Sequence, residues 1–271
     1  MRISTSLPLL GLNWNRTMNP YLVIPVNQFI RVESTICNSK GRIEIEINRH
    51  ITVLDKRLKV ISHKLTKVYN HLSSKSNKGL CFKVYVPESS YISLVSVYTV
   101  STLSAIYIAL KEILDGKPRE EDIIDIAGFI WSDEKPNVKM LYEALLISAM
   151  RRKAILYRGR DEQILLDDFL LDSVQSGRVI PLNSIVERYF DPQLESALVK
   201  LEGTSVINAV NTLVSENNRN NFNSKLVALQ DFFKIDNAIS YILYSLPVPQ
   251  RNCKYIQSVE GYLEEICFGS Y

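Results

Sequence analysis

The densest group of side chains able to do chemistry is a basic cluster on one short stretch of the chain. It consists of Arg151, Arg152, Lys153, Arg158 and Arg160. Such a cluster could bind the phosphates of a small ligand or of nucleic acid, or an acidic partner. The alternative is that these cations pair with nearby carboxylates, namely Asp161, Glu162, Asp167 and Asp168. We favour ion pairing, because these acids follow the cluster closely in the sequence.

Carboxylates and imidazoles offer few further candidates for a metal or catalytic centre. Asp167, Asp168 and Asp172 could hold Mg²⁺, but we favour a solvated helix start at these positions. His63 and His71 lie eight residues apart on a predicted helix without a third ligand, so we expect surface positions. The sequence contains no G-x-S-x-G, H-E-x-x-H or GxxxxGK[ST] motif. We therefore expect no metal site.

The four cysteines, Cys37, Cys81, Cys253 and Cys267, are far apart and form no C-x-x-C pair. Metal sites built on thiolates need clustered ligands. We therefore expect buried free thiols in a cytoplasmic protein.

The length and charge of the chain limit its function classes. With 271 residues, it can form one large domain or two smaller ones. A net charge of +3 is too small to indicate a nucleic-acid-binding protein, which usually has a clearly basic face. The N-terminal apolar run is short, contains Pro8 and Gly11 and lacks an A-x-A-like cleavage site, so we expect no signal peptide.

Residues 89–110, which carry no charged side chain, organise the rest of the chain. A run of this length is close to the ~20 residues that span a bilayer. However, Ser and Thr make up about a third of it, and no second span or basic flank follows. A helix that is apolar on nearly all sides is otherwise a buried one. We predict a buried central helix and no membrane contact.

Hydrophobic periodicity predicts strands before this helix and mostly helices after it. The predicted strands are residues 2–12, 21–35 (one bent strand or two), 42–47 and 80–86, with an amphipathic helix over 55–72. The predicted later helices are 119–130, 138–150, 192–201, 204–216, 222–234 and 236–245. Two strands are expected within 154–166, a break at 172–181, and a helix or a hairpin turning at Gly261 over 254–268.

This order of elements is similar to that of the GHMP kinase superfamily, which includes mevalonate kinase, homoserine kinase and diphosphomevalonate decarboxylase. The resemblance covers the whole chain in its organisation. It implies an α+β fold with a ribosomal S5 domain 2-like N-terminal part and a mostly helical, ferredoxin-like C-terminal part. We predict that the domains are residues 1–175 and 176–271.

Three places carry the resemblance, and each departs from the family pattern. At the first place, Leu9–Arg16 (LLGLNWNR) and Ile24–Asn27 (IPVN) resemble the decarboxylase branch. The segment Asn13–Asn15 stands where that branch has a lysine-bearing K-Y-W-G-K motif. The resemblance implies that Asn13 and Asn27 face a ligand.

The second place is the phosphate loop, for which the family has P-x-x-x-G-L-x-S-S-A. The matching segment is Pro87–Val97 (PESSYISLVSV). Such a loop binds phosphates with its backbone and with the positive end of the following helix. Tyr91 and Ser93 stand at the glycine positions, and glycine is the residue that lets a backbone approach a phosphate closely. The resemblance assigns the binding of a nucleotide to the hydroxyls of Ser89, Ser90, Ser93 and Ser96, with ATP and Mg²⁺ as cofactors only if the chain is an active kinase.

The third place is Tyr142–Lys153 (YEALLISAMRRK), where the family has a catalytic aspartate followed by a Gly-Gly pair. Glu143 or Ala144 lies at the position of the acid, depending on the branch compared. An acid here would orient or deprotonate the acceptor hydroxyl, so Glu143 is the catalytic candidate. We favour the alternative, a solvated acid on a helix surface. Arg151 and Arg152 replace the glycines and would face a ligand.

The glycine and catalytic positions are altered together, while the hydrophobic pattern of the scaffold persists. We therefore expect a diverged cytoplasmic protein without efficient ATP-dependent phosphotransfer, which binds a small ligand or a protein partner. One alternative is an active small-molecule kinase acting on a hydroxy acid such as mevalonate or shikimate. The other is a structural subunit whose exposed apolar face serves oligomerisation. An open cleft lined by the basic cluster and the serines favours a ligand, and a cleft plugged by Tyr91 or Trp14 favours a partner.

Overall fold

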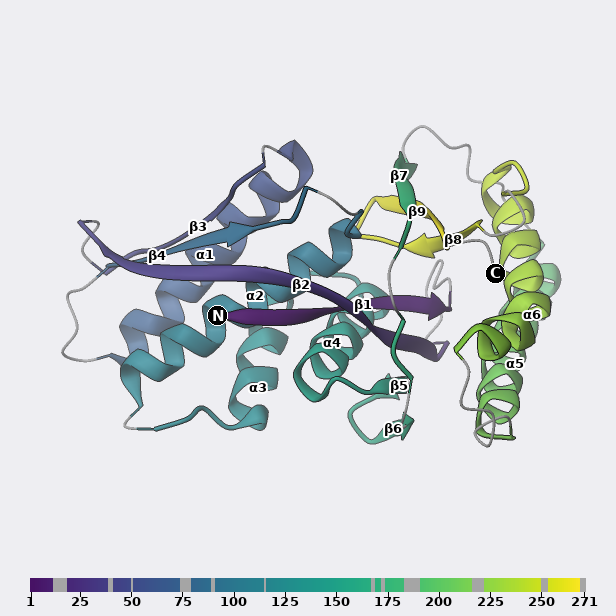
Figure 1. The fold of residues 1–271 in the computed structure, drawn as a ribbon, viewed down its shortest axis with the longest axis horizontal. Coiled ribbons are helices and arrows are strands. Elements are labelled where there is room, and N and C mark those ends of the chain that lie inside the picture. The colour runs from purple at the N-terminus through teal and green to yellow at the C-terminus, as the bar shows by residue number, and fades with distance from the viewer. Residues whose placement is uncertain are drawn as a thin grey trace.

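The computed structural model describes residues 1–11, 19–38, 41–49, 51–73, 79–88, 91–114, 116–166, 169–171, 174–182, 191–215, 222–249 and 253–268. Its strands are β1 (Arg2–Leu10), β2 (Tyr21–Cys37), β3 (Ile43–Ile47), β4 (Gly79–Tyr85), β5 (Ala154–Gly159), β6 (Glu162–Leu166), β7 (Ser176–Pro181), β8 (Cys253–Gln257) and β9 (Tyr262–Cys267). Its helices are α1 (Thr52–Leu72), α2 (Leu94–Ile113), α3 (Glu120–Ile130), α4 (Pro136–Arg151), α5 (Pro192–Ser215) and α6 (Phe222–Tyr244). Figure 1 shows α1–α4 beside the long strands β1 and β2, and α5 and α6 at the opposite end of the molecule.

The first sheet has the strand order β3-β4-β2-β5-β6, and β1 also pairs with β2. β2 is one continuous strand through Pro25, which lies opposite Ser6 of β1. β3 and β4 are parallel, and α1 connects them along the chain. The three- and four-residue spacing of apolar side chains along α1 buries one face, which includes Leu58, Ile61 and Leu65. The predicted strands and amphipathic helix of this part are confirmed.

Residues 94–110 of the uncharged stretch form most of α2, which packs against β1 and against α1, α3 and α4. Four of its buried hydroxyl groups donate hydrogen bonds to the carbonyl oxygen one turn earlier, at 2.6 to 2.9 Å; they belong to Thr99, Ser101, Thr102 and Ser104. Because these polar atoms are satisfied within the helix, the helix can be buried on nearly all sides. α2 is long and apolar enough to cross a membrane, but 83% of its most apolar stretch is buried inside the protein.

The C-terminal part combines the three-stranded sheet β7-β9-β8 with the long helices α5 and α6. The hairpin alternative is confirmed for residues 254–268, because Gly261 has a φ of +83° at the turn between β8 and β9. The predicted break at 172–181 is wrong in part, because Ser176–Pro181 pair with β9 as a strand. The four short helices predicted in this part are two long ones. The division into domains at residues 175 and 176 stays a prediction.

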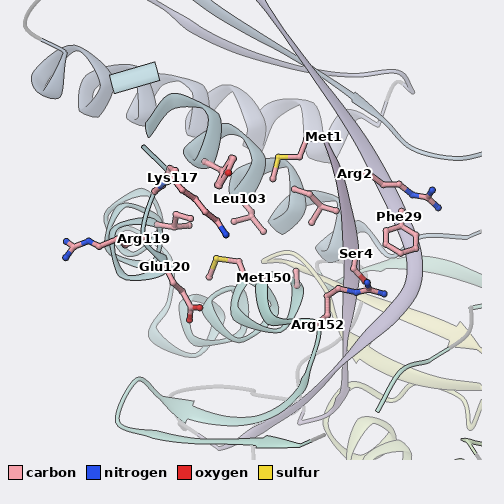
Figure 2. A pocket seen from close by; sticks show the side chains of 15 residues that line it. Met1, Arg2, Ser4, Phe29, Leu103, Lys117, Arg119, Glu120, Met150 and Arg152 are labelled. Carbon is pink, nitrogen blue, oxygen red and sulfur yellow. The ribbon is translucent and has the colours of Figure 1, made fainter. Parts of the chain in front are cut away.

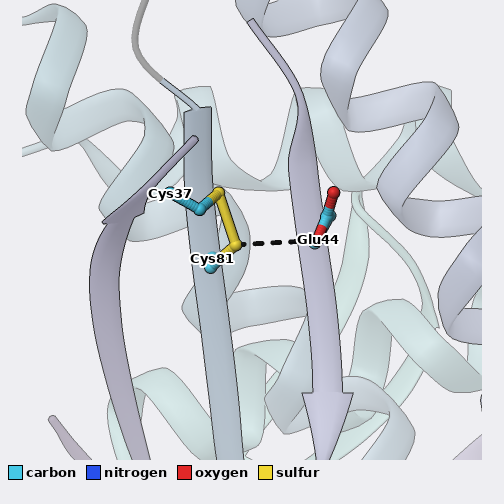
Figure 3. Close-up of side chains that lie close together, drawn as sticks. All are labelled: Cys37, Glu44 and Cys81. Carbon is cyan, nitrogen blue, oxygen red and sulfur yellow. Dashed lines mark hydrogen bonds between the residues drawn. A yellow bond between two sulfur atoms is a disulfide. The ribbon is translucent and has the colours of Figure 1, made fainter. Parts of the chain in front are cut away.

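All four cysteines lie in disulfides, so the prediction of free thiols is wrong. Cys37 of β2 is bonded to Cys81 of β4, as Figure 3 shows. Cys253 and Cys267 lie directly opposite each other on β8 and β9. The bonded cysteines are 44 and 14 residues apart in the sequence. Neither disulfide could be predicted from this spacing, because only the register of the paired strands brings the sulfur atoms together.

Candidate functional site

The segment that resembles a phosphate loop connects β4 to α2. The helix begins at Leu94, and Ser93 is its N-cap residue with a φ of −57° and a ψ of 139°. The first turn of any helix leaves backbone N–H groups without partners inside the helix, and these attract anions. Ser89 and Ser90 lie outside the described residues, as do Asn13 and Trp14.

The carboxylate of Glu264, from β9, lies on the N-terminus of α2. Oε2 accepts a hydrogen bond from the Leu94 N–H at 3.0 Å, and Oε1 accepts one from the Val95 N–H at 3.4 Å. The Ser93 hydroxyl donates to Oε1 at 2.9 Å, and the Ser258 hydroxyl donates to the same oxygen. Glu264 is fully buried. Its negative charge is therefore stabilised by directed donors and by the positive end of the helix dipole.

Tyr91 closes the site on the side of the C-terminal sheet. Its hydroxyl donates to Oε2 of Glu264, and its backbone carbonyl accepts a hydrogen bond from the Gln28 side chain at 3.1 Å. Burial, together with the Glu264 carboxylate, raises the pKa of the Tyr91 hydroxyl well above its usual value, so the hydroxyl stays a donor. The ring packs on Gly177, where an added Cβ would collide with it. Tyr91 thus fills the position where the family pattern has a glycine.

Of the other predicted ligand-binding positions in this region, Ser96 bonds within the protein through its side chain and Asn27 through its backbone. The Ser96 hydroxyl donates to the carbonyl oxygen of Ser6 on β1. The Asn27 side chain is exposed, and the Asn27 N–H donates to the Leu171 carbonyl oxygen at 2.7 Å. The hydroxyls of Ser93 and Ser96 are therefore both engaged within the protein.

Glu143 is buried on α4, so its interpretation as a solvated surface acid is wrong. Only 8% of Glu143 is exposed, and its Oε2 accepts a hydrogen bond from the Tyr157 hydroxyl at 3.0 Å. Arg160 lies 3.8 Å from its other oxygen. Burial and the Glu143 carboxylate raise the pKa of Tyr157. The carboxylate thus joins α4 to β5.

Most of the basic cluster forms ion pairs, as favoured, but chiefly with acids of α3. Arg151 contacts Glu120 at 2.6 Å, and Arg160 contacts Asp125 at 2.6 Å. Arg152 differs, because its guanidinium lies over the ring of Phe29, 5.5 Å from the ring centre. The structure therefore separates Arg152 from Arg151, although the sequence places them side by side.

The histidines considered as metal ligands belong to no cluster among the described residues, whereas Cys37, Glu44 and Cys81 do lie close together. His63 and His71 are exposed on α1, as expected. The acids Asp167, Asp168 and Asp172 lie outside the described residues. A Glu44 oxygen lies 3.7 Å from Cys81 Sγ (Figure 3). While the disulfide between Cys37 and Cys81 is intact, these sulfur atoms are bonded to each other and are not thiolate ligands.

Sequence reasoning missed a buried ion pair between Lys254 of β8 and Asp236 of α6. Nζ lies 3.0 Å from Oδ2, and the two side chains are 1% and 0% exposed. Nζ also donates to the carbonyl oxygen of Leu9 and lies 5.0 Å from the ring centre of Phe233. Burial lowers the pKa of Lys254 and raises that of Asp236, while their mutual attraction opposes both shifts. The pair joins β1 to the C-terminal helices.

Neither a protein-family model nor a curated protein matches this sequence. Solved structures do match. Mevalonate kinase from methicillin-resistant Staphylococcus aureus has 15% identity and a TM-score of 0.58, over 99% of this chain and 90% of the other. L. major mevalonate kinase, solved with R-mevalonate, has 12% identity and a TM-score of 0.61, over 99% and 86%. Streptococcus pneumoniae phosphomevalonate kinase, solved with phosphomevalonate and AMPPNP, has 10% identity and a TM-score of 0.52, over 100% and 92%.

The chain has the GHMP kinase fold. The likeness confirms the α+β class and the resemblance of the whole chain. Identities of 10 to 15% show the fold alone, so the chemistry has to be argued from the side chains. In this GHMP kinase fold, the helix end that resembles the phosphate loop is occupied by a carboxylate of the same chain.

Proposed function

We propose that this protein is a diverged member of the GHMP kinase fold that acts by binding and does not transfer phosphate from ATP. The observation that carries the proposal is the Glu264 carboxylate at the N-terminus of α2. It uses the N–H groups that would otherwise bind a phosphate. A triphosphate at this position would have to displace a buried carboxylate or lie against its charge, and like charges in a buried site repel strongly.

Two further features support the proposal. Tyr91 and Ser93 replace the glycines that would let a nucleotide approach the backbone. The Ser96 hydroxyl donates a hydrogen bond to the Ser6 carbonyl oxygen, and the carboxylate of the candidate base Glu143 accepts one from the Tyr157 hydroxyl. In an active kinase these groups would contact ATP and the acceptor hydroxyl, whereas here they contact the protein itself.

Between a small ligand and a protein partner, a cavity beside α2 and Arg152 favours a small ligand. Its charge and shape are described in the next subsection. The two disulfides do not support the cytoplasmic location expected from the sequence, because disulfides are rare in the cytosol except in hyperthermophiles.

A phosphotransfer assay tests the proposal. The purified protein is incubated with Mg-ATP and with mevalonate, shikimate and other small hydroxy acids, and phosphorylated products are measured by mass spectrometry. We expect none above the level of a Glu143→Gln, Ser93→Ala double variant. A phosphorylated hydroxy acid formed by the wild type and not by the double variant would overturn the proposal and establish the active-kinase alternative.

A further inference from the structure

A cavity of 610 Å³ lies beside the C-terminal half of α2, away from the helix end that Glu264 occupies. Its volume is within the ~300–1,000 Å³ range of small-molecule sites. The start of β1, Phe29 of β2, the segment before α3 and the end of α4 surround it, as Figure 2 shows. Elements far apart in the sequence thus build one site.

Apolar side chains form much of the lining of this cavity. They belong to Ile3, Leu103, Tyr107, Ile123, Ala149 and Met150. Ile3, Leu103 and Ile123 are at most 6% exposed and belong to the main hydrophobic core, so this part of the wall is held by packing. Such a surface binds the apolar part of a ligand.

The charged side chains at the cavity are mostly cationic and only partly neutralised. The cations are Arg2, Lys117, Arg119 and Arg152, and the single acid in the lining is Glu120. Arg119 donates to both Asp122 oxygens at 2.8 and 3.0 Å, and Glu120 pairs with Arg151. Among the described residues, this leaves Arg2, Lys117 and Arg152 without an acidic partner.

The three unpaired cations lie on two sides of the cavity. Figure 2 shows the Lys117 amine pointing into the hollow, towards Leu103 and Met150, while Arg2 and Arg152 lie beside Phe29 on the far side. The guanidinium carbons of Arg2 and Arg152 are 4.3 and 5.5 Å from the centre of the Phe29 ring. Stacking on the ring restrains both side chains. Both side chains are exposed, and an anion that contacts both guanidinium groups would reduce the repulsion between them.

We propose that this cavity binds an organic phosphate with a small apolar body. Three cations suit a doubly charged head group better than a single carboxylate, and guanidinium groups form paired hydrogen bonds with phosphate oxygens. The apolar wall then covers the rest of the ligand. The inference rests on the small-ligand part of the proposed function and names the chemistry of that ligand, but it uses no side chain of the closed site at Glu264.

Isothermal titration of the full chain with n-hexyl phosphate, inorganic phosphate, hexanoate and n-hexanol tests both halves of the proposal. We expect hexyl phosphate to bind at least tenfold more tightly than each of the other three. Within the alkyl phosphates, each added methylene group from methyl to hexyl should strengthen binding roughly threefold to fourfold as it becomes buried. Hexanol binding as tightly as hexyl phosphate, or no gain with chain length, would overturn the proposal.

Variants locate the site. Arg152→Gln and Lys117→Gln should each weaken hexyl phosphate binding about tenfold or more, because each removes a charged hydrogen-bond donor. The matched control is Lys111→Gln, an exposed lysine on α2 outside the cavity, which should bind like the wild type. Unfolding curves of the free variants establish that they are folded. Unchanged affinity of both cavity variants for hexyl phosphate, or no binding of hexyl phosphate to the wild type, would contradict the proposed binding site. Repeating the hexyl phosphate titration in excess Mg-ATP tests the two proposals separately. The cavity and the helix end at Glu264 share no residue, so hexyl phosphate should bind equally well with and without the nucleotide.

Discussion

The Glu264 carboxylate accepts a 3.0 Å hydrogen bond from the backbone N–H of Leu94, the first residue of α2. The two residues are 170 positions apart in the sequence. One buried carboxylate therefore connects strand β9 to the central helix. Helix N-termini bind anions because their N–H groups and dipole are unsatisfied. In this protein the anion is supplied by the chain itself.

We predict that Glu264→Ala lowers the free energy of unfolding by about 2–4 kcal/mol, because several buried donors lose their acceptor. Urea denaturation measures the change. The matched control is Glu112→Ala, an exposed acid on α2, which should change stability by less than about 0.5 kcal/mol.

Acetate should restore part of the stability of Glu264→Ala, because it returns a carboxylate to the vacated donors. The midpoint of thermal unfolding is compared in sodium acetate and in sodium chloride of equal ionic strength. An equal response of the wild type and the variant to acetate would show that the carboxylate position is not an anion site.

The buried pair of Lys254 and Asp236 predicts a strong dependence of each residue on the other. Lys254→Met should cost about 3–5 kcal/mol, because it leaves Asp236 buried without its cation, whereas removing both charges should cost less than removing the cation alone. A double-mutant cycle with Asp236→Leu, followed by urea denaturation, measures the coupling. Additive effects of the two substitutions would contradict the pairing.

The disulfides predict that the unfolded, unreduced protein has no free thiol. A thiol reagent added in denaturant without reductant counts them. Replacing Cys253 and Cys267 with serine should cost about 3 kcal/mol, since the bond closes a loop of 14 residues in the unfolded chain. Four reactive thiols in this assay would contradict the disulfides and would support the predicted free thiols.

The partly buried carboxylate of Glu134 predicts a pH dependence of stability. Glu134 accepts a hydrogen bond from Arg57 at 3.0 Å, but burial raises the pKa of Glu134 to about 7, and a hydrogen bond with Glu260 adds to the increase. The folded state then binds more protons than the unfolded state between about pH 4.5 and 7. This group therefore lowers the stability of the folded state as the pH rises through that window.

Glu134→Gln removes this contribution. The stability of the variant relative to the wild type should rise by on the order of 1–3 kcal/mol from pH 4.5 to pH 7. Urea denaturation at several pH values measures the difference. A difference that is constant with pH would contradict the raised pKa.

Local sequence patterns predicted most of the elements, because periodicity and turn residues act over short distances. Residues 94–110 form a mostly buried stretch of helix because they lack charged side chains and most of their hydroxyls bond within the helix. The two helices predicted on either side of Gly203 are one helix, α5, since a glycine within a helix is tolerated where the helix packs on other elements. Gly203 lies against the Asn19 side chain.

The site depends on contacts that local patterns do not reveal. In the sequence, Glu264 is one of several acids near the C-terminus and has no distinguishing feature. Only the pairing of β9 brings it to α2. Lys254 likewise looks like a surface lysine until α6 covers it. The absence of glycines at Tyr91 and Ser93 predicted an altered phosphate loop, which stays a prediction, but it gave no sign of the carboxylate at the start of α2.

Thermal unfolding of the wild type with and without Mg-ATP tests the central claim most directly. A nucleotide at 100 times its dissociation constant would add roughly 2.7 kcal/mol and raise the midpoint by a few degrees. With the N-terminus of α2 occupied by Glu264, we expect no increase. An increase that persists in Arg152→Gln but is lost in Ser93→Ala would show that ATP binds at the helix end and would contradict the account.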